Sequence, residues 1–503
     1  LFFSFPLLHA GWMPDGHLLK WGMIWFAAGL SAFVFLRGEM RMDSLDALAA
    51  GLFAWLLLSV LWTPDPKMGM EALTRFGPAV LLFLVLRRIP SIRNIAAPAA
   101  VLGMLFGLLA SVEYAGMGNP TFLVEGLAVL SLLCFGTPVG VAIGLAGLVA
   151  VLTVGSLIAK LIVAVWAFVW LFLAFRSVWG RSALVGFGLL AVVLVLVNSV
   201  EAQIGIQTRL DLFASTAFAW ADRFWFGWGV GSFNYILPAY GNVGVGLIPY
   251  SVESSTFPGA AHNDFLQLAM EGGVVALGIA LAGVWLILRG SAGINRTALL
   301  TFLGLSLVGF AFQNPVALVG AVLAASAIPP SGKGFMVPGR LVGATAAVFC
   351  LVLVTSLPSR AVSEAHFSAT LRHLSAATHE DANPLTAEFD KDASPVAALF
   401  HANEAYKLAP WRFETRLALF QAATLSNQII GLPKDDQIEE AWRIAQTASP
   451  LNPSMLLARL GYLGRNDRCP EECEPLVAIL LGTAWRKQEV QWLVDKAFER
   501  TGV

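Results

Sequence analysis

Charged residues are scarce in this sequence of 503 amino acids. They make up 13% of the chain, whereas hydrophobic residues make up 57%; a soluble domain carries roughly 25% charged residues. A formal net charge of −1 argues against the concentrated basic face that nucleic acid requires. Cysteine is rarer still, with four residues, and no motif has the ligand spacing of a metal site. These absences argue against a soluble protein and a nucleic-acid partner, and we expect neither metal nor cofactor.

Long apolar blocks recur from the start of the chain to about Leu357. Because a hydrocarbon core of about 30 Å takes roughly 20 apolar residues per helix, the blocks predict a polytopic bundle of about twelve spans. They lie near residues 20–37, 46–62, 72–87, 95–112, 121–136, 138–154, 157–174, 182–199, 263–288, 297–313, 315–330 and 341–357. Residues 1–11 are interpreted as the tail of another span in a truncated chain, since no basic segment marks a signal peptide.

From Pro358 onward the sequence becomes charged and resembles that of a soluble protein. We therefore predict an all-α protein with a transmembrane domain over residues 1–357 and a soluble helical domain over 358–503. Lys and Arg follow every second span, and short basic loops remain cytoplasmic. The remaining loops, the stretch 200–261 and the C-terminal domain are then expected on the extracytoplasmic side.

Two features of the C-terminal domain agree with that location. Cys469 and Cys473 form Cys-Pro-Glu-Glu-Cys, and a disulfide between them fits an oxidising compartment; two free thiols are the alternative. The pattern Ala-x-x-Leu-x-Pro occurs at 405–410 and again at 448–453. It resembles tetratricopeptide-type helical repeats, in which small residues permit close helix packing, although a small irregular bundle is also compatible with it.

The stretch 200–261 is predicted to be one large loop without a clear fold of its own, and loops of such length usually carry function. Arginine matches phosphate oxygens, Trp and Tyr favour headgroup depth, and glycine permits close backbone approach. No Rossmann or Walker pattern is present, so an aromatic belt with turn glycines and arginines reaching the interface is the alternative. The residues of interest are Arg209, Arg223, Trp228, Gly229, Gly231 and Tyr240.

His262 follows this loop and opens the run His-Asn-Asp-Phe-Leu-Gln. A neutral imidazole can take a proton from a hydroxyl near pH 7, whereas a structural histidine is the more ordinary interpretation. Glu271 would lie about 13 Å further along a continuous helix, so we assign it a structural hydrogen-bonding role. Lys160, near the outer end of a predicted span, is a candidate for binding an anionic ligand.

The order of these elements resembles the O-antigen ligase and polymerase family of bacterial inner-membrane glycosyltransferases. The similarity covers roughly residues 180–290 and is carried by Arg209, by Gly-Trp-Gly-Val-Gly-Ser-Phe from residue 227, and by the run from His262 with Glu-Gly-Gly beyond it. The resemblance implies a metal-independent enzyme of the GT-C type. Such an enzyme moves a glycan from an undecaprenyl-diphosphate carrier to an acceptor hydroxyl on the periplasmic face.

The same resemblance implies roles for individual residues. His262 would activate the acceptor hydroxyl, Arg209 would stabilise the leaving diphosphate, and Arg223 is a second candidate for that role. The family often carries Ser-Arg where this chain has Lys160, so Lys160 is expected to substitute for that arginine. Contacts with the substrate are expected from Lys160, Asn263, Trp228 and Tyr240, and structural roles from Glu271, Gly229 and Gly231.

Several points stay open at this stage. The acceptor could be a lipid, a glycan or a protein, and membrane lipids are the other expected partners. A transporter or flippase for lipid-linked glycans is the main alternative, for which buried charges near the midplane and repeated halves would be expected. A non-enzymatic scaffold is a second alternative, but it leaves the loop with arginines and aromatic residues unexplained.

Overall fold

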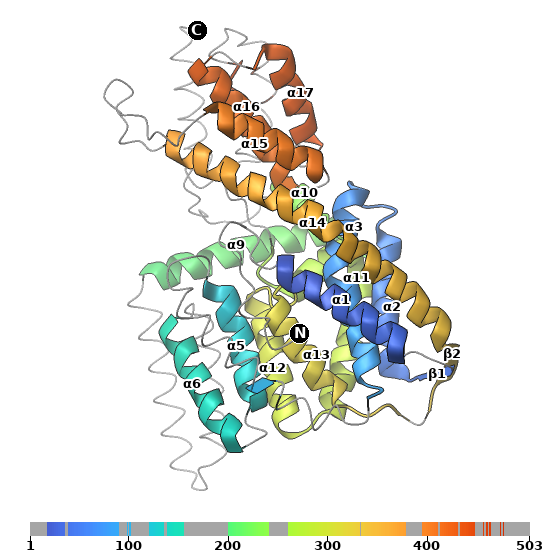
Figure 1. Cartoon of the computed structure of the whole chain (residues 1–503). Helices are drawn as coiled ribbons and strands as arrows, with labels where there is room; N and C mark the ends of the chain where they lie inside the picture. Colours follow the sequence, from blue (N-terminus) through green and yellow to red (C-terminus); the bar gives the residue numbers. More distant parts are fainter. Residues whose placement is uncertain are drawn as a thin grey trace.

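The computed structural model describes residues 18–35, 39–89, 120–134, 138–154, 200–240, 260–331, 333–378, 395–410, 413–430 and 433–447. It also places ten single residues: 98, 100, 101, 456, 459, 460, 462, 463, 473 and 476. Over these residues the chain is mostly helical, as the sequence predicts (Figure 1). The helices are α1 (Leu18–Phe35), α2 (Ser44–Ser59), α3 (Pro66–Leu86), α5 (Pro120–Cys134), α6 (Pro138–Val154), α9 (Val200–Asp222), α10 (Phe233–Ile236), η2 (Leu237–Tyr240), α11 (Asp264–Gly290), α12 (Gly293–Val308), α13 (Pro315–Ser326), α14 (Gly339–Thr378), α15 (Pro395–Leu408), α16 (Phe413–Ile430) and α17 (Asp435–Gln446).

Three helical segments are long and apolar enough to cross a membrane: α3, α11 and the part of α14 from Val342 to Phe367. Shorter apolar helices accompany them in α1, α2, α12 and α13. The predicted spans near 157–174 and 182–199, and nearly all of 95–112, lie outside the described residues. Each of the other predicted spans falls on a helix.

Short polar side chains set where several of these helices begin. Asp43 and Asp46 form a capping box at the start of α2, and Asp65 caps α3, whose first residue is proline. Asn263 and Asn314 cap α11 and α13 in the same way. Each cap accepts a hydrogen bond from a backbone N–H that the helix itself cannot satisfy.

Helices α1 and α14 pack closely along one side of the molecule. A Cβ atom at Gly29 would lie 2.6 Å from the Cβ of Cys350, so only glycine permits this approach. At one end of the pair, β1 (Glu39–Met42) and β2 (Phe335–Pro338) form a two-stranded antiparallel sheet with Glu39 opposite Pro338. The all-α prediction did not include this sheet.

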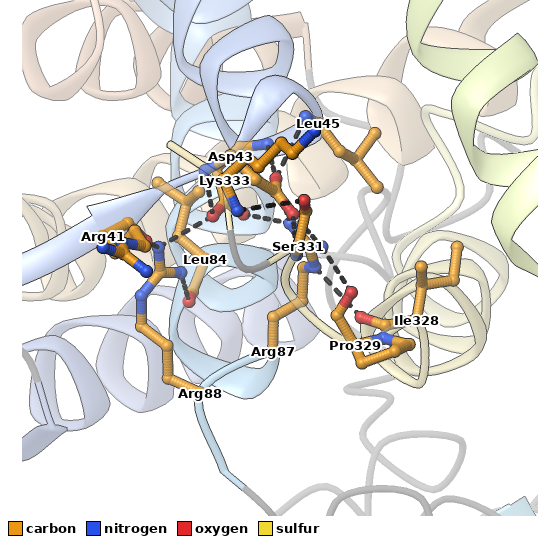
Figure 2. Close-up of polar contacts among 11 residues, drawn as sticks. Arg41, Asp43, Leu45, Leu84, Arg87, Arg88, Ile328, Pro329, Ser331 and Lys333 are labelled. Carbon is orange, nitrogen blue, oxygen red and sulfur yellow. Dashed lines mark hydrogen bonds and ion pairs between the residues drawn. The ribbon is translucent and has the colours of Figure 1, made fainter. Parts of the chain in front are cut away.

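A buried ion-pair network lies near the sheet, around Arg87 at the end of α3 (Figure 2). The Arg87 side chain is 1% exposed and pairs with Asp43, at 2.8 Å, and with Asp46. Arg88 pairs with the second oxygen of Asp46 at 2.8 Å. Burial by itself would raise the pKa of Asp43, but the Arg87 guanidinium and the N–H groups of Ser331 and Asp46 hold it well below its usual range. The network therefore joins α2, α3 and the segment after α13 through charges that would be costly to bury alone.

The prediction that residues 200–261 form one loop is wrong for its first part, because residues 200–222 form α9. This helix runs crosswise to α5 and α6 in Figure 1 and packs against α11. Its buried positions follow a four-residue spacing at Asp211, Leu212, Ser215, Thr216 and Ala219. Since three of these five residues are polar, the apolar periodicity that identifies a surface helix is weak.

At the other end of the chain, α14 continues through Pro358 without a break, across the expected domain boundary. Beyond it, α15, α16 and α17 pack on one another in chain order around Phe420 and Trp442. Arg416 of α16 joins this region to Asp65 by a 2.8 Å ion pair. The second Ala-x-x-Leu-x-Pro copy lies outside the described residues.

Candidate functional site

His262 lies on the last turn of chain before α11 and has an unusual backbone conformation. Its φ of 52° is in the left-handed region, which a non-glycine residue seldom adopts. The ring packs against Phe310, with ring centroids 4.9 Å apart. The preceding Ala261 N–H donates to Gln267 Oε1 at 3.1 Å, and Asn263 accepts from Leu266 N–H at 3.0 Å. Asn263, expected to contact substrate, therefore also caps the helix that follows His262.

Arg209 of α9 lies within electrostatic range of His262. Burial, and then the positive charge of Arg209, lower the pKa of His262 to about 4. The imidazole is therefore neutral at physiological pH and can accept a proton. The packing of α9 on α11 thus brings Arg209 near His262, although the two residues are distant in sequence. The resemblance assigns both residues to the same reaction.

Arg223, Trp228 and Tyr240 form a second group, at the far end of α9. The Arg223 guanidinium lies over the Trp228 ring at 4.2 Å from its centroid, a cation–π geometry. The Trp228 and Tyr240 rings are 6.4 Å apart. Burial and the Asp222 carboxylate, to which Tyr240 donates, raise the pKa of Tyr240 far above its usual value. This group offers one cation and two aromatic faces, which are the elements that contact a phosphate and a sugar.

The segment from Gly227 to Gly231, hereafter the glycine loop, turns sharply at three glycines with positive φ. A Cβ at Gly229 would lie 2.6 Å from Thr63, and one at Gly231 would lie 2.6 Å from the carbonyl oxygen of Met68. Ser59 Oγ accepts from Val230 N–H at 3.0 Å. Gly229 and Gly231 are therefore required by close packing on the turn before α3 and on its first residues, whereas Gly227 packs on the backbone of Glu271 and Gly273.

Glu271 holds the glycine loop from the other side. Its Oε2 accepts from Gly231 N–H at 3.0 Å, its Oε1 accepts from Gln267 at 3.2 Å, and its carbonyl accepts from Gly229 N–H at 2.8 Å. The N–H groups of Gly229 and Gly231 are thus already engaged and do not cradle a phosphate. Helix α11 is kinked immediately afterwards, at Gly273 with φ 71°. These hydrogen bonds join Glu271 to the glycine loop and to Gln267, and none of them involves His262.

A cavity of about 80 Å³ lies beside Glu271, and its mostly apolar lining includes four polar side chains. Asp264, Gln267 and Gln313 line it together with Glu271. Asp264 is buried and accepts from Phe312 N–H at 2.9 Å. Asp264 could have been found from the sequence, because it belongs to the run that begins at His262. Gln313 could not, because it comes from the distant turn between α12 and α13.

An apolar cavity of about 210 Å³ adjoins the cavity beside Glu271. It runs along α2 from Leu45 to Leu56 and is also lined by side chains of α3, α11, α12 and α13. Phe265 and Phe312 line both cavities, so the two are neighbours. Together they form a mostly apolar volume, with the four polar side chains at the end beside Glu271.

Two of the predicted positions, Lys160 and Cys469, lie outside the described residues. Cys473 is disulfide-bonded, whereas Cys134 and Cys350 are free and buried. Among the described residues, no group of three His, Cys, Asp or Glu side chains is placed to hold a metal ion.

The fold and these sites define a mostly helical protein with candidate membrane-spanning helices and one polar region where α9 meets the start of α11. No protein-family model matches the chain, and no curated protein is significantly similar to it.

Proposed function

We propose that the protein is a membrane glycosyltransferase of the O-antigen ligase or polymerase type. It would transfer a glycan from an undecaprenyl-diphosphate carrier to an acceptor hydroxyl on the periplasmic face of a bacterial inner membrane. The observation that carries the proposal is the pairing of a neutral His262 with Arg209. The start of α11, which directly follows His262, lines two adjoining and mostly apolar cavities. The proposed reaction needs a base for the acceptor hydroxyl, a fixed cation for the diphosphate and an apolar volume for the lipid.

In the proposed reaction the acceptor oxygen bonds to the anomeric carbon while the bond from that carbon to the diphosphate oxygen breaks. The electron pair stays on the diphosphate, where Arg209 stabilises it, and the acceptor proton passes to His262. Displacement from the opposite face inverts the anomeric configuration. Arg223, over Trp228 at the far end of α9, would bind a more distant sugar of the glycan rather than the diphosphate held by Arg209.

The pKa of His262 supports this assignment in one further way. With a pKa of about 4, the imidazole is a weak base, because burial and then the charge of Arg209 oppose its protonation. A bound diphosphate would offset that charge and raise the pKa toward the range in which general base catalysis is efficient. Donor binding would thus make His262 a stronger base, although the effect of burial on its pKa would remain.

The finer parts of the proposal concern topology and partners. The full bundle of about twelve spans would place α9 and the glycine loop on the periplasmic side, with the repeat-like C-terminal helices above them. The acceptor is a lipid, a glycan or a protein, and the C-terminal region is a surface on which it could dock. No metal or cofactor is required, because fixed cations supply the charge stabilisation.

A transporter for lipid-linked glycans is the second candidate, and one observation favours it. Transporters use interrupted helices beside buried ionisable residues, and α11 is kinked at Gly273 beside the buried Glu271. The carboxylates of Glu271 and Asp264, however, accept hydrogen bonds from the backbone. Such fixed bonds suit a structural role better than a cycle of proton uptake and release.

The test is a transfer assay with purified protein in proteoliposomes and an undecaprenyl-diphosphate-linked glycan as donor. His262→Asn is the variant of choice, because asparagine tolerates the left-handed backbone that His262 adopts. We expect a loss of transfer of about 10²- to 10⁴-fold, while His373→Asn, in the distant C-terminal part of α14, retains activity. Full activity of His262→Asn would refute the catalytic assignment, and translocation of the donor without any transfer product would favour the transporter.

A further inference from the structure

The turn that follows α9 exposes three consecutive aromatic side chains. Phe224, Trp225 and Phe226 are 40%, 65% and 58% exposed. A single exposed aromatic residue is ordinary, but a contiguous apolar group on the surface marks an interaction site. We call residues 223–226 the aromatic turn.

The surface around the aromatic turn continues onto the outer end of α2. The Phe226 ring stacks on Trp55 at 5.9 Å and meets Trp62 edge-on at 6.3 Å. Beside these rings, the segment at the end of α2 exposes Leu57, Leu58 and Leu61 to 46%, 47% and 79%. The aromatic turn therefore continues the exposed apolar face of α2. If lipid covers that face of α2, it also covers the aromatic turn.

Contacts with α11 fix the position of the aromatic turn along the axis of that helix. Phe224 accepts a 2.9 Å hydrogen bond from Val274 N–H, and a Cβ at Gly273 would lie 2.1 Å from the Trp225 carbonyl oxygen. The turn is thus locked to the kink of α11. From Gly273 to its end at Gly290, α11 is about 27 Å long at 1.5 Å per residue, close to the roughly 30 Å of a hydrocarbon core.

Charged residues lie before this length at one end and in its last turn at the other. Asp264 and Glu271 precede the kink, and Arg289 is in the last turn of α11. The boundary between hydrocarbon and headgroups then passes through Gly273, which is the level of the aromatic turn. Aromatic rings prefer this depth because one part of the ring is in an apolar region and the other near water.

We propose that the aromatic turn is a membrane-interface anchor whose Trp225 and Phe226 side chains insert into the headgroup region of the outer leaflet. The partner is a lipid surface, since the exposed rings continue the face of a candidate membrane helix. The anchor would hold α9 and the start of α11 at a fixed height above the bilayer. This inference does not depend on the proposed enzymatic activity.

The test uses a spin label at Trp225→Cys in the full-length protein, reconstituted in nanodiscs of phosphatidylethanolamine and phosphatidylglycerol. The background is favourable, because Cys134 and Cys350 are buried and Cys473 is disulfide-bonded. Val396→Cys is the matched control, since Val396 is 57% exposed on α15 and should face water. Collision rates with oxygen, which partitions into lipid, and with a water-soluble nickel chelate report the depth of each label.

We expect the label at position 225 to show a several-fold higher ratio of oxygen to nickel accessibility than the label at position 396. A label at Phe226→Cys should give the same result and guards against a local effect of one substitution. Equal, aqueous accessibility at positions 225 and 396 would overturn the proposal. A label shielded from both reagents, with dipolar broadening between copies, would also overturn it and would indicate that a second chain covers the turn.

Discussion

The positive charge of Arg209 acts on the imidazole of His262 and, together with burial, lowers the pKa of that imidazole to about 4. The two residues come from different helices, and no local sequence feature links them. Their relationship depends on the packing of α9 against α11 and is the point at which the proposed chemistry can be tested most directly.

Removing the charge of Arg209 should raise the pKa of His262. In Arg209→Gln the electrostatic cause is lost while burial remains, so we expect the pKa to move from about 4 part of the way toward 6.5. The rate of modification of His262 by diethylpyrocarbonate, followed by peptide mass spectrometry as a function of pH, measures the neutral fraction. Arg296→Gln, at an exposed position in α12, should leave the midpoint unchanged, and an unchanged midpoint in Arg209→Gln would contradict the assignment.

The same shift predicts how stability depends on pH. The folded chain protonates His262 only near pH 4, whereas the unfolded chain does so near 6.5. Protons therefore bind preferentially to the unfolded state between these values, and the free energy of unfolding should fall as the pH is lowered through this window. His262→Asn should remove this part of the slope, which thermal unfolding in detergent at a series of pH values would detect.

Gly273 should not tolerate a side chain. A Cβ there would lie 2.1 Å from the Trp225 carbonyl oxygen, and the residue has a φ of 71°. We expect Gly273→Ala to lower the free energy of unfolding by about 3 kcal/mol or more, since both the contact and the backbone conformation oppose it. Gly278→Ala, in the same helix with nothing within 4 Å of the added Cβ, should change it by less than about 1 kcal/mol. Similar losses for both variants would mean that the kink is not held by this contact.

The sequence was sufficient for the helices that are apolar throughout, because length and hydropathy alone identify them. Helix α9 could not be found in this way, since its buried face includes Asp211, Ser215 and Thr216. The Thr216 hydroxyl donates to the Leu212 carbonyl at 2.6 Å, so this polar residue can be buried. A buried polar residue adds nothing to the apolar periodicity by which a helix is recognised in the sequence. The continuity of α14 across Pro358 was missed for a related reason, because proline usually ends a helix in water but is tolerated among apolar helices.

The sequence likewise predicts only part of the candidate site. Individual side chains such as His262 and Arg209 could be chosen from their chemistry, whereas their proximity could not, because it is a tertiary contact. The hydrogen bonds from the glycine loop to Glu271 likewise join segments that are distant in sequence. The buried network of Arg87 illustrates the limit, since its basic position was used only for orientation and its carboxylate partners come from another helix.

Arg87 should be among the most sensitive charged residues of the described chain. In Arg87→Met, Asp43 would lose both of its guanidinium bonds and Asp46 one, and an uncompensated buried charge costs about 3–5 kcal/mol. Arg88→Met should cost less, because the Arg88 side chain is 16% exposed and Asp46 keeps Arg87. The pKa of Asp43 lies well below its usual value, so this stabilisation is present at neutral pH and lost as the pH falls below the unfolded value near 3.8. Chemical unfolding of both variants would be compared, and equal losses would contradict the prediction.

The ion pair between Arg416 and Asp65 should couple the C-terminal helices to the turn that supports the glycine loop. Both side chains are largely buried, at 6% and 12% exposure, so the pair is screened little by water. A double-mutant cycle with Asp65→Asn and Arg416→Met isolates the interaction, because asparagine preserves the helix cap at the start of α3. We expect a coupling free energy above about 1 kcal/mol, whereas the exposed pair of Arg443 and Glu440, at 70% and 55% exposure, should give less than about 0.5 kcal/mol. Equal coupling in the two cycles would mean that the C-terminal helices contact the glycine-loop support without stabilising it.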